Sequence, residues 1–559
     1  YYRVKNLISY IVLFLMAVIP VLGEAQSNIS VDIEEEYYHR ILQISGLSDI
    51  NYSFNLRPYN YDFSVENDHP WQHVFGNRSQ ENRASGINFY SPILFQSYNT
   101  TLPRGNNDGA VWQGKGYNAA FSTGFLLSKG PFNLQFRPVF TFSQNRDFFL
   151  GPYEPPIIRD YGMASEFAYR DFRGAIDFVQ RYGDQAYFRT FLGESFVDIR
   201  YKGIRLAFTN EMHWSGPGVN TSLQFGYSAP GFKHIYLGTY EPLHTLAGTF
   251  EFGYIFGGMK ESEYFDSNED NNLQSVNSLT FSYTPWFSDH FSIGFVRTFF
   301  HHFPESFSEY RFQASKLFEA VTRKGLSTED NPTGQSSDNQ MANIFLRYFI
   351  PGSGFEVYTE FGRNDHNANW RDFRAHPDHQ RAYTIGLIKS FQMSENRLLA
   401  LHFELNQMET NRTSLTRGNK HLGGWFTHGN QIQGFTNMGQ IPGTGFGPGM
   451  NMQMLKGDLY DENGRFSLKM ARIVYHNSRL DQYFRFIEAA NSEPIERWQV
   501  RNVEFMIGAE KTFFLSHGIE LSTAIEQSVI LNHHYLKNND LLNTRFEIRV
   551  RKRIQGWLR

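Results

Sequence analysis

The pattern that decides the fold is clearest at residues 118–143, which run NAAFSTGFLLSKGPFNLQFRPVFTFS. Two stretches with apolar residues at every second position flank the short turn at 128–131. Alternation with a period of two puts one set of side chains on each face of a strand. Phe136 and Phe140 therefore share one orientation, as Phe121 and Phe125 do. The stretch predicts an antiparallel hairpin with a tight turn.

Short turns alternate with long polar segments along the rest of the chain. Further turns of this kind lie at 201–203, 287–290, 351–354, 394–397, 462–464 and 516–518. Between the hairpins run longer segments rich in Gly, Asn, Asp, Arg and Pro, such as 144–187, 303–340 and 411–449. Outer-membrane barrels of bacteria have this asymmetry, because their periplasmic turns are short and their extracellular loops are long.

About eighteen segments show the strand pattern, an even number as in single-chain bacterial barrels. They lie near 87–98, 118–127, 132–143, 188–200, 204–211, 232–240, 245–257, 277–286, 291–302, 341–350, 355–365, 379–392, 397–410, 450–456, 465–477, 501–514, 518–531 and 542–553. These segments do not repeat one another, which argues against a propeller. The sequence predicts an all-β fold, a transmembrane antiparallel β-barrel with a short helical segment before it.

The composition fits a barrel better than the alternatives. Aromatic residues make up 17% of the chain, with 54 Phe and 31 Tyr, yet the mean hydropathy is −0.46. A helical membrane protein needs runs of about 20 apolar residues, and none follows the N-terminal region. A barrel is compatible with low hydropathy because half of each strand faces a polar lumen. A soluble secreted sandwich or propeller explains the alternation equally well, but not the aromatic content and the turn asymmetry.

Charge and cysteine content exclude several function classes. The net charge is −4 and the isoelectric point is about 6.6, so no electrostatic footprint for nucleic acid is present. The chain has no cysteine. Disulfides, thiol chemistry, thiolate metal sites and a lipoprotein anchor are thereby excluded.

The N-terminal region has the features of a signal peptide. Arg3 and Lys5 precede an apolar stretch at 7–22, and 23–25 is an A-x-A-like cleavage site. We expect residues 1–25 to be the signal peptide and the protein to reach the bacterial outer membrane. A retained anchor helix is the alternative, although the apolar stretch contains Pro20 and is short for a span.

The next segment, 26–85, differs from the strands that follow. Apolar residues near helical spacing at 31–42, with acidic residues in the first turn, predict a short periplasmic helix. We therefore divide the mature chain into a partly helical periplasmic segment, 26–85, and a barrel with long extracellular loops, 86–559. Part of 157–182 also has helical spacing and predicts a small helix. Segment 212–231 is expected to be an outward loop.

No catalytic motif is present. The sequence has no G-x-S-x-G elbow, no H-E-x-x-H helix and no G-x-x-x-x-G-K-[ST] loop. The glycine-rich stretch 443–449 contains Pro448, which lacks an N–H donor, so an inward-folding loop is favoured over a phosphate cradle. Together with the length of 411–449, it predicts that this loop folds into the lumen or its mouth. We expect no catalytic residues and no enzymatic activity.

Metal and cofactor sites are not indicated either. Segment 266–272 is similar to a calcium loop, but its sixth position is not Gly and its twelfth is Asn277. The pairs 301–302 and 533–534 are adjacent histidines in a strand context, whose rings should point to opposite faces. We expect no metal ligands and no cofactor.

Three loop segments suit carbohydrate instead. Sugars are bound by aromatic faces that stack on C–H-rich surfaces and by polar side chains that contact hydroxyls. Segments 212–220, 364–372 and 424–430 combine both kinds of side chain. The candidate saccharide contacts are His213, Trp214, Trp370, Arg371, Asp372, Trp425 and His428. The alternative is that these aromatic residues form the interfacial girdle or pack the loops together.

Several ordered blocks resemble the Wzi family of capsule-assembly proteins. The blocks are 107–116, 210–218, 229–234, 355–360, 379–386, 434–440 and 445–449. The resemblance implies an outer-membrane barrel of about eighteen strands with periplasmic helices. It also implies a non-catalytic lectin that helps to hold capsular polysaccharide on the cell surface.

The expected function is therefore binding of surface or capsular polysaccharide and assistance in its assembly or retention. The expected partners are this polysaccharide, outer-membrane lipid and, during biogenesis, the barrel assembly machinery. The alternative is an outer-membrane porin or channel for small solutes, which an open lumen would favour. A barrel-borne hydrolase ranks third, because no nucleophile–base pair is visible.

Overall fold

The computed structural model describes most of the chain. The described residues are 29, 31–48, 52–58, 69–75, 85–150, 157–158, 162–163, 165–169, 176–318, 339–364, 374, 377–378, 380–409, 425–427, 431–476, 500–554 and 557–558. The expected signal peptide, 1–25, lies outside them. Within the described residues, no helix has the length and apolar character to cross a membrane.

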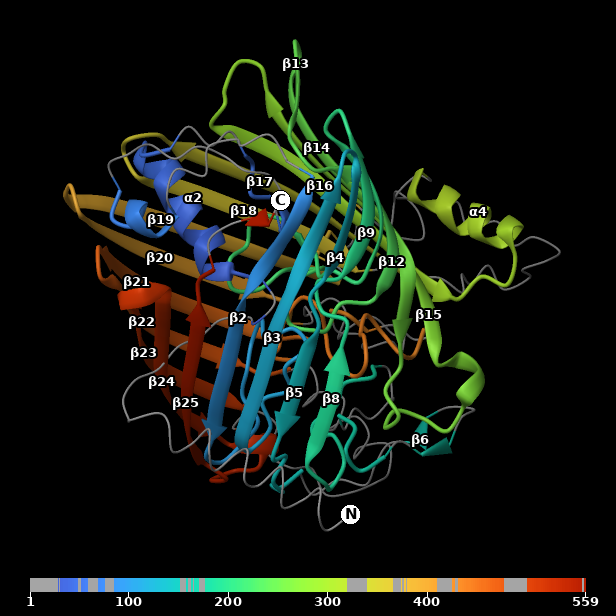
Figure 1. Ribbon diagram of the computed structural model, residues 1–559. Helices are drawn as coiled ribbons and strands as arrows, with labels where there is room; N and C mark the ends of the chain where they lie inside the picture. Colours follow the sequence, from blue (N-terminus) through green and yellow to red (C-terminus); the bar gives the residue numbers. More distant parts are fainter. Residues whose placement is uncertain are drawn as a thin grey trace.

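The strands form one closed antiparallel barrel (Figure 1). They are β2 (Gly86–Asn99), β3 (Gly116–Lys129), β4 (Phe132–Phe136), β5 (Val139–Ser143), β8 (Tyr187–Phe191), β9 (Phe196–Tyr201), β10 (Ile204–Thr209), β12 (Lys233–Thr239), β13 (Leu243–Thr245), β14 (Gly248–Lys260), β15 (Leu273–Pro285), β16 (Phe291–His302), β17 (Asn339–Ile350), β18 (Phe355–Asn364), β19 (Arg381–Ser394), β20 (Arg397–Gln407), β21 (Asn451–Asp461), β22 (Gly464–Val474), β23 (Val503–Leu515), β24 (Ile519–Leu531), β25 (Leu541–Lys552) and β26 (Trp557–Leu558).

Closure and strand number follow from the pairing. Strand β2 pairs with β3 on one side and with β25 on the other. The pairs β4 and β5, β8 and β9, β12 and β13, and β25 and β26 are each two pieces of one span, so the barrel has 18 strands. The predicted fold class and strand number are confirmed.

Proline explains where two spans are irregular. A proline has no N–H to donate to a strand ladder, so it favours bulges and strand ends. The register of β2 against β3 shifts between Tyr90 and Ile93, around Pro92. Pro138 lies in the gap between β4 and β5. Each span continues past its proline, because its hydrogen-bond pairing with strand β3 resumes on the other side.

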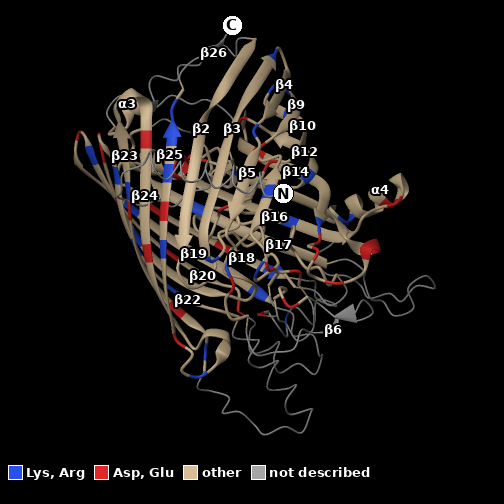
Figure 2. Cartoon of the chain, turned by 60° about the horizontal axis from the view of Figure 1, so that its bottom comes forward, with Lys and Arg blue, Asp and Glu red and all other residues tan. Residues whose placement is uncertain are grey.

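The two faces of the wall differ as the alternation predicts. Phe121, Phe136 and Phe140 are 39–44% exposed on the outer face. Residues at the alternate positions of the same strands, such as Asn118 and Ser143, are buried on the lumen side. Charge is distributed unevenly around the wall: β25 carries four basic residues and one acidic residue, whereas the neighbouring β2 and the next strand, β3, are almost uncharged (Figure 2).

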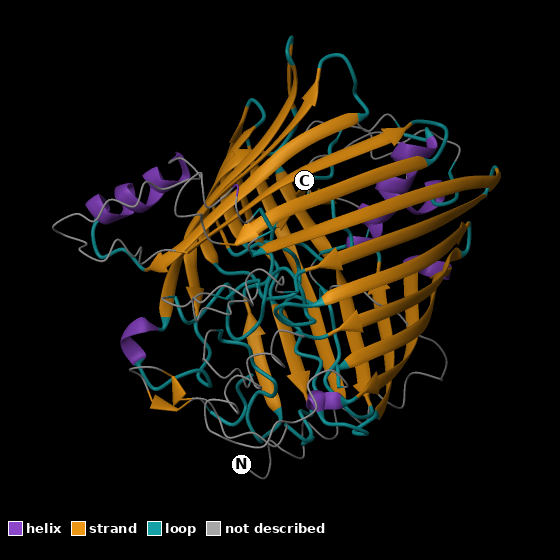
Figure 3. Ribbon diagram, turned by 180° about the vertical axis from the view of Figure 1, so that it is seen from behind, coloured by secondary structure: helices purple, strands orange, loops and turns teal. Residues whose placement is uncertain are grey.

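Helix α2 (Ile33–Ser45) lies inside the barrel, near the short turns (Figures 1 and 3). The side chain of Asp32 caps its N-terminus by accepting a hydrogen bond from the Glu35 N–H at 3.2 Å. The helix reaches opposite parts of the wall, because Arg40 pairs with Glu356 on β18 and Asp32 pairs with Arg551 on β25. The predicted helix is thus present, but it lies in the lumen. The chain division at 25 and 85 stays a prediction.

The remaining short elements lie inside the barrel, at its ends or beside it. They are β1 (Leu56–Arg57), β11 (Trp214–Ser215), β6 (Ile157–Ile158), β7 (Gly162–Met163), α3 (Gln72–Phe75), α4 (Phe307–Ser315), η1 (Glu269–Asn271), η2 (Lys316–Phe318), η3 (Ser516–Gly518) and η4 (His533–Tyr535). The small helix predicted within 157–182 is wrong for the described residues there. They contain the β6–β7 pair and a bridge between Ala168 and Val179, because the segment pairs with itself.

Loops fill the lumen beyond α2. Segment 212–231, expected as an outward loop, is buried throughout most of its length inside the barrel, so that expectation is wrong. The described parts of 411–449 are also buried there, as predicted: Phe426 and Phe435 are fully inaccessible, and Phe435 packs against both Phe426 and Phe225. These apolar rings form a core in the lumen, which a water-filled channel would lack.

Candidate functional site

Side chains on the lumen face of β18 form hydrogen bonds and ion pairs with the helix and the loop that fill the barrel. Glu356, Tyr358 and Glu360 alternate along the strand and are all buried. The Arg40 Nε donates to Glu356 Oε1 at 2.9 Å, and the Arg347 Nη2 donates to Glu356 Oε2 at 2.7 Å. One carboxylate therefore joins the α2 plug, the helix at the inner end of the lumen, to the wall. Charge-assisted bonds of this kind are stronger than neutral ones.

Two further carboxylates fix the loop 212–231 in the lumen. Glu360 Oε1 accepts from the Gly218 N–H at 2.9 Å, and Glu404 Oε2 accepts from the Val219 N–H at 2.7 Å. The Tyr358 hydroxyl donates to Glu404 Oε2 at 2.6 Å. Side-chain contacts therefore replace the ladder that this stretch of backbone would have in a sheet.

Gly216 shows why this loop needs glycine. Its φ is +93°, and a Cβ there would lie 2.5 Å from Glu360 Oε1. Only a residue without a side chain tolerates both the conformation and the approach of the carboxylate. The glycines of the block 210–218 thus have a structural role in packing the lumen.

Trp214 lies inside the barrel and not on its outer surface. It is 1% exposed, the Arg57 guanidinium lies 4.5 Å from its ring centroid, and its ring packs edge-on against Tyr227. The neighbouring His213 stacks on Tyr236 at 5.1 Å, and its Nε2 lies 2.8 Å from His234 Nε2. The predicted outward placement of both residues is wrong, because their loop turns back into the lumen.

Trp425 is also buried. It is 2% exposed, and its indole N–H donates to the Leu223 carbonyl at 2.7 Å. The other candidates, Trp370, Arg371, Asp372 and His428, lie outside the described residues. The structure thus brings Trp214 and Trp425 into the packed interior. A role of the seven candidates in saccharide binding stays a prediction.

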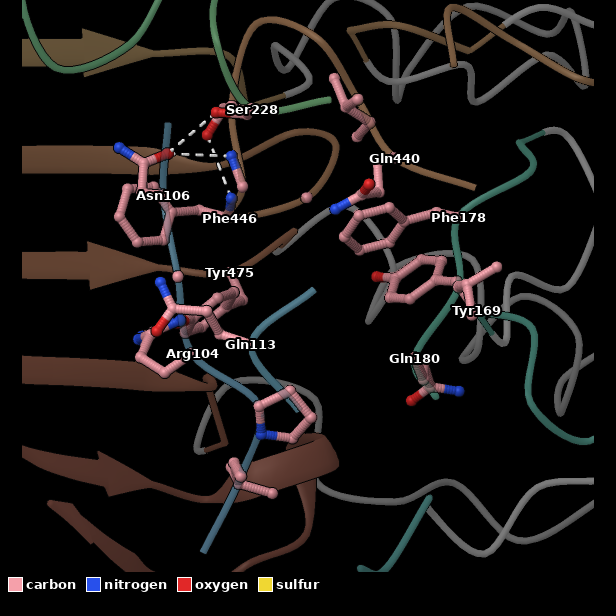
Figure 4. A pocket seen from close by; sticks show the side chains of 18 of the residues that line it. Arg104, Asn106, Gln113, Tyr169, Phe178, Gln180, Ser228, Gln440, Phe446 and Tyr475 are labelled. Atoms are coloured by element: carbon pink, nitrogen blue, oxygen red, sulfur yellow. Dashed lines mark hydrogen bonds between the residues drawn. The ribbon is translucent and has the colours of Figure 1, made fainter. Parts of the chain in front are cut away.

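A cavity of about 210 Å³ lies at the long-loop end of the lumen; we call it the outer cavity. One wall comes from 102–113, 444–448 and 475–476, and the facing wall comes from 169 and 178–180, with Gln440 beside Phe178 (Figure 4). Its aromatic lining residues include Trp112, Tyr169, Phe178, Phe446, Tyr475, His476, His533 and His534, and its polar ones include Arg104, Asn106, Asn107, Asp108, Gln113, Gln180, Gln440, Asn502 and Glu504.

The first wall is held by a buried ion pair. Arg104 pairs with Glu504, and the Tyr475 hydroxyl donates to the same carboxylate at 2.6 Å. The Arg104 guanidinium also lies 5.3 Å from the ring centroid of Phe446. Asn106 is fixed as well, since its Oδ1 accepts from the Gly445 N–H at 3.0 Å. The aromatic and amide groups of this wall are therefore preorganised.

The facing wall presents flat rings. Tyr169 and Phe178 pack edge-on at 5.6 Å, and Gln180 donates to the Ala168 carbonyl at 2.7 Å. Across the cavity, the Tyr169 hydroxyl lies 3.3 Å from His476 Nδ1. In Figure 4, the rings of Tyr169 and Phe178 face Tyr475 and Phe446 across the open space. Such an arrangement can receive a flat ligand between rings.

Burial leaves the outer cavity with little net charge near neutral pH. It raises the pKa of Asp108 to about 7, although Arg545 and Gln113 oppose the shift. Burial also lowers the pKa of His533 to about 4, and Arg104 adds to the effect. Arg104 itself is neutralised by Glu504. Among the described residues, Asn502 Oδ1 and His533 Nδ1 are buried without a hydrogen-bond partner. These features suit a neutral, hydrogen-bonding ligand.

The sequence pointed to part of this site only. Block 107–116 was singled out for its resemblance, but Tyr169 and Phe178 fall in the segment for which a helix was predicted. The expectation that the rings of His533 and His534 point apart is also wrong, since their centroids are 4.0 Å apart. Both residues lie in the turn η4, and His534 has a φ of +56°, so strand alternation does not apply.

No protein-family model and no curated protein matches the chain. Solved structures do match. Wzi of Escherichia coli, an outer-membrane protein involved in group 1 capsule assembly and described as a carbohydrate-binding β-barrel, is 12% identical with a TM-score of 0.53, over 82% of this chain and 84% of that one.

Two further structures show a weaker likeness. Acinetobacter baumannii OccAB4 is 9% identical with a TM-score of 0.38, over 84% of this chain and 99% of that one. Pseudomonas aeruginosa OpdK, solved with vanillate, is 10% identical with a TM-score of 0.38, over 82% and 97%. Identities this low concern the fold alone. The chain is an outer-membrane-type β-barrel whose fold is similar to that of Wzi.

Proposed function

We propose that this protein is a non-catalytic outer-membrane barrel that binds surface polysaccharide in the outer cavity and helps its assembly or retention at the cell. The outer cavity carries this proposal. It opens among the long loops, which face outward in bacterial barrels, and it combines ring faces with side-chain amides. The similarity in fold to Wzi, described as carbohydrate-binding, supports it.

The chemistry of the lining matches a sugar ring. A pyranose offers C–H-rich faces, which pack against aromatic rings, and hydroxyls around its edge. An amide side chain can both donate to and accept from hydroxyls. Asn106, Gln113, Gln180 and Gln440 supply such groups around the rings. A neutral or weakly charged saccharide fits better than a strongly ionic solute, because the charges present are already paired.

The filling of the lumen favours binding over transport. Below the outer cavity, the described residues place the loop 212–231 and then helix α2 across the barrel. A porin needs a continuous aqueous path. In this barrel, buried rings such as those of Phe225 and Phe435 block the aqueous path through the lumen. A channel function would require these elements to move.

The candidate residues then divide into two groups. We propose that His213, Trp214 and Trp425 act by packing the lumen loops, since both tryptophans are buried and His213 stacks on Tyr236. Trp370, Arg371, Asp372 and His428 remain proposed saccharide contacts. Insertion by the barrel assembly machinery, and export by the signal peptide, also remain part of the proposal.

Calorimetric titration tests the proposal. The full-length barrel in detergent is titrated with polysaccharide extracted from the surface of the producing cells. The double variant Trp112→Ala and Tyr169→Ala should bind more weakly. Trp286→Ala is the matched control, because Trp286 is an aromatic residue that is 72% exposed near the short turns, away from the outer cavity.

Two outcomes would overturn the proposal. No binding by the unmodified protein removes the lectin function, and unchanged binding by the double variant removes the outer cavity as its site. Planar-bilayer conductance distinguishes the porin alternative, since an unmodified barrel that conducts steadily would need an open lumen.

A further inference from the structure

Segment 303–318 leaves the barrel on the outside of the wall. Helix α4 (Phe307–Ser315) and the following turn η2 (Lys316–Phe318) project beside β15 and β16, outside the barrel in two opposite views (Figures 1 and 3). The described parts of two other long loops at this end, 212–231 and 431–449, pack into the lumen instead.

The segment covers a polar patch on the outward face of the wall. Phe295 is 39% exposed on that face of β16, so Arg297, Phe299 and His301 share its orientation by alternation. Ser275 and Asn277 lie opposite His301 and Phe299 on β15 and share the face as well. All five are nonetheless at most 8% exposed. They are hidden by segment 303–318 and would otherwise face the membrane.

Hydrogen bonds join three of the covered side chains, those of Ser275, Asn277 and Arg297, to the segment. The Arg297 Nη1 donates to the Leu317 carbonyl at 3.0 Å. The Ser275 hydroxyl donates to Gln313 Oε1, and the Asn277 amide donates to the Gln313 carbonyl, each at 2.8 Å. An uncovered polar group within the hydrocarbon region of a membrane is costly, because no water is present to bond it. The segment thus removes a polar patch from contact with lipid.

The face that the segment presents outward is aromatic. Phe307, Phe312 and Phe318 are 74%, 57% and 81% exposed. Between them, Tyr310 packs edge-on against Phe256 at 4.5 Å, and its hydroxyl lies 3.2 Å from that of Tyr254. These two partners point outward from β14. The exposed rings are therefore continuous with the aromatic outer surface of the barrel.

Two basic side chains border this face. Arg311 is exposed on the helix, whereas Lys316 is 3% exposed and its ammonium lies 4.9 Å from the ring centroid of Phe312. Aromatic rings with basic neighbours are typical of helices that lie in the interface between hydrocarbon and headgroups. The position near the long-loop ends of β15 and β16 corresponds to the outer leaflet.

We propose that segment 303–318 is an interfacial element that embeds Phe307, Phe312 and Phe318 in the outer leaflet and shields the polar patch of β15 and β16 from lipid. The occupant of its exposed face is membrane lipid. The proposal depends on the membrane barrel and not on saccharide binding, so it stands or fails independently of the proposed function.

Site-directed spin labelling tests this, because the chain has no native cysteine. Phe312→Cys carries the label in the full-length barrel, reconstituted in phosphatidylcholine vesicles. Phe295→Cys is the lipid control on the wall, and Phe149→Cys, at a position 52% exposed at the long-loop end, is the water control. The ratio of collision rates with oxygen and with a water-soluble nickel chelate is measured for each.

The label at 312 should match the label at 295, with a far higher ratio than the label at 149. Phe318→Cys repeats the measurement if Phe312→Cys does not fold. A ratio at 312 and 318 equal to that at 149 would overturn the proposal. So would strong dipolar broadening that disappears when unlabelled protein is added, since a second copy would then cover the face.

Discussion

The inner and outer ends of the lumen are both filled, but by different chemistry. At the inner end, the α2 plug meets the wall through ion pairs such as Arg40 with Glu356 and Asp32 with Arg551. At the outer end, rings and amides such as those of Tyr169 and Gln180 line an open cavity. The charged groups of the inner end pair with one another, whereas the outer cavity is lined mainly by aromatic rings and neutral amides.

This difference predicts a separation of effects. Changes at the inner end should alter stability and leave saccharide binding nearly intact, because no residue of helix α2 lines the outer cavity. Changes at the outer cavity should do the reverse. Each variant below is therefore measured for both the free energy of unfolding and the affinity for polysaccharide.

The largest effect is expected for Glu356→Ala at the inner end. The variant leaves both Arg40 and Arg347 buried without their carboxylate. Removal of one partner from a buried ion pair costs about 3–5 kcal/mol. The free energy of unfolding, from urea titration of the barrel in lipid vesicles, should fall by this amount.

Glu395→Ala is the matched control, since Glu395 is an exposed glutamate in the turn between β19 and β20. It should change the unfolding midpoint very little. Equal midpoints for Glu356→Ala and Glu395→Ala would show that the ion pairs do not hold the plug.

A smaller effect is expected for Glu404→Ala, which lies between the two ends. The variant removes the acceptor of the Val219, Asn220 and Thr221 N–H groups. A hydrogen bond to a charged group contributes about 1.5–3 kcal/mol, so the loss should lie in that range. The freed loop should also raise the ion conductance of the barrel.

Glu404→Gln is the informative companion, because its amide oxygen still accepts a hydrogen bond. Its conductance should lie between those of the unmodified protein and Glu404→Ala. Unchanged conductance in both variants would mean that the loop 212–231 is not what closes the lumen.

The contrast between wall and lumen also explains what the sequence could predict. Strand positions follow from alternation and from turns such as 128–131, which are local signals. Contacts inside the lumen join residues far apart in the chain, as Glu404 and Val219 do, and no periodicity encodes them. The segment around Trp214 has the composition of an outward sugar-binding loop. Its backbone nevertheless lies in the lumen, because carboxylates on distant strands accept hydrogen bonds from it.

The outer cavity was only partly predictable for the same reason. Block 107–116 contains Trp112, which lines the cavity. The facing wall depends on the irregular backbone around Tyr169 and Phe178, where spacing in the sequence indicated a helix. The short stretches around Ala168 and Val179 pair through a single β-bridge, and a pairing this short produces no periodic pattern in the sequence.

A third prediction concerns Phe178→Ala in the outer cavity. Loss of one stacking ring should weaken saccharide binding by about 0.5–1.5 kcal/mol, the range for aromatic pairs. The unfolding midpoint should move much less than in Glu356→Ala. Phe188→Ala, at a position 69% exposed on the outer wall, is the control for loss of an aromatic ring. Equal affinities in the two variants would argue against stacking on Phe178.

The smallest effect, a pH dependence, should arise at the inner end. Burial raises the pKa of Glu36 in α2 to about 7, against the charge of Arg57 and a hydrogen bond from Tyr227. The pKa in the unfolded chain is near 4.5. Because the folded value is the higher one, the stability that protonated Glu36 contributes is fully present below pH 4.5 and is lost as the pH rises through about 7.

The variant Glu36→Gln keeps this side chain neutral at every pH. Its free energy of unfolding, relative to that of the unmodified protein, should therefore increase between pH 5 and pH 8. Asp32 should behave in the opposite way: although burial opposes it, Arg551 and Arg549 hold the pKa of Asp32 well below its usual range. Asp32→Asn should thus cost stability at neutral pH, and the cost should shrink as the pH falls below 4. Parallel pH profiles for the two variants would contradict the opposite pKa shifts of Glu36 and Asp32.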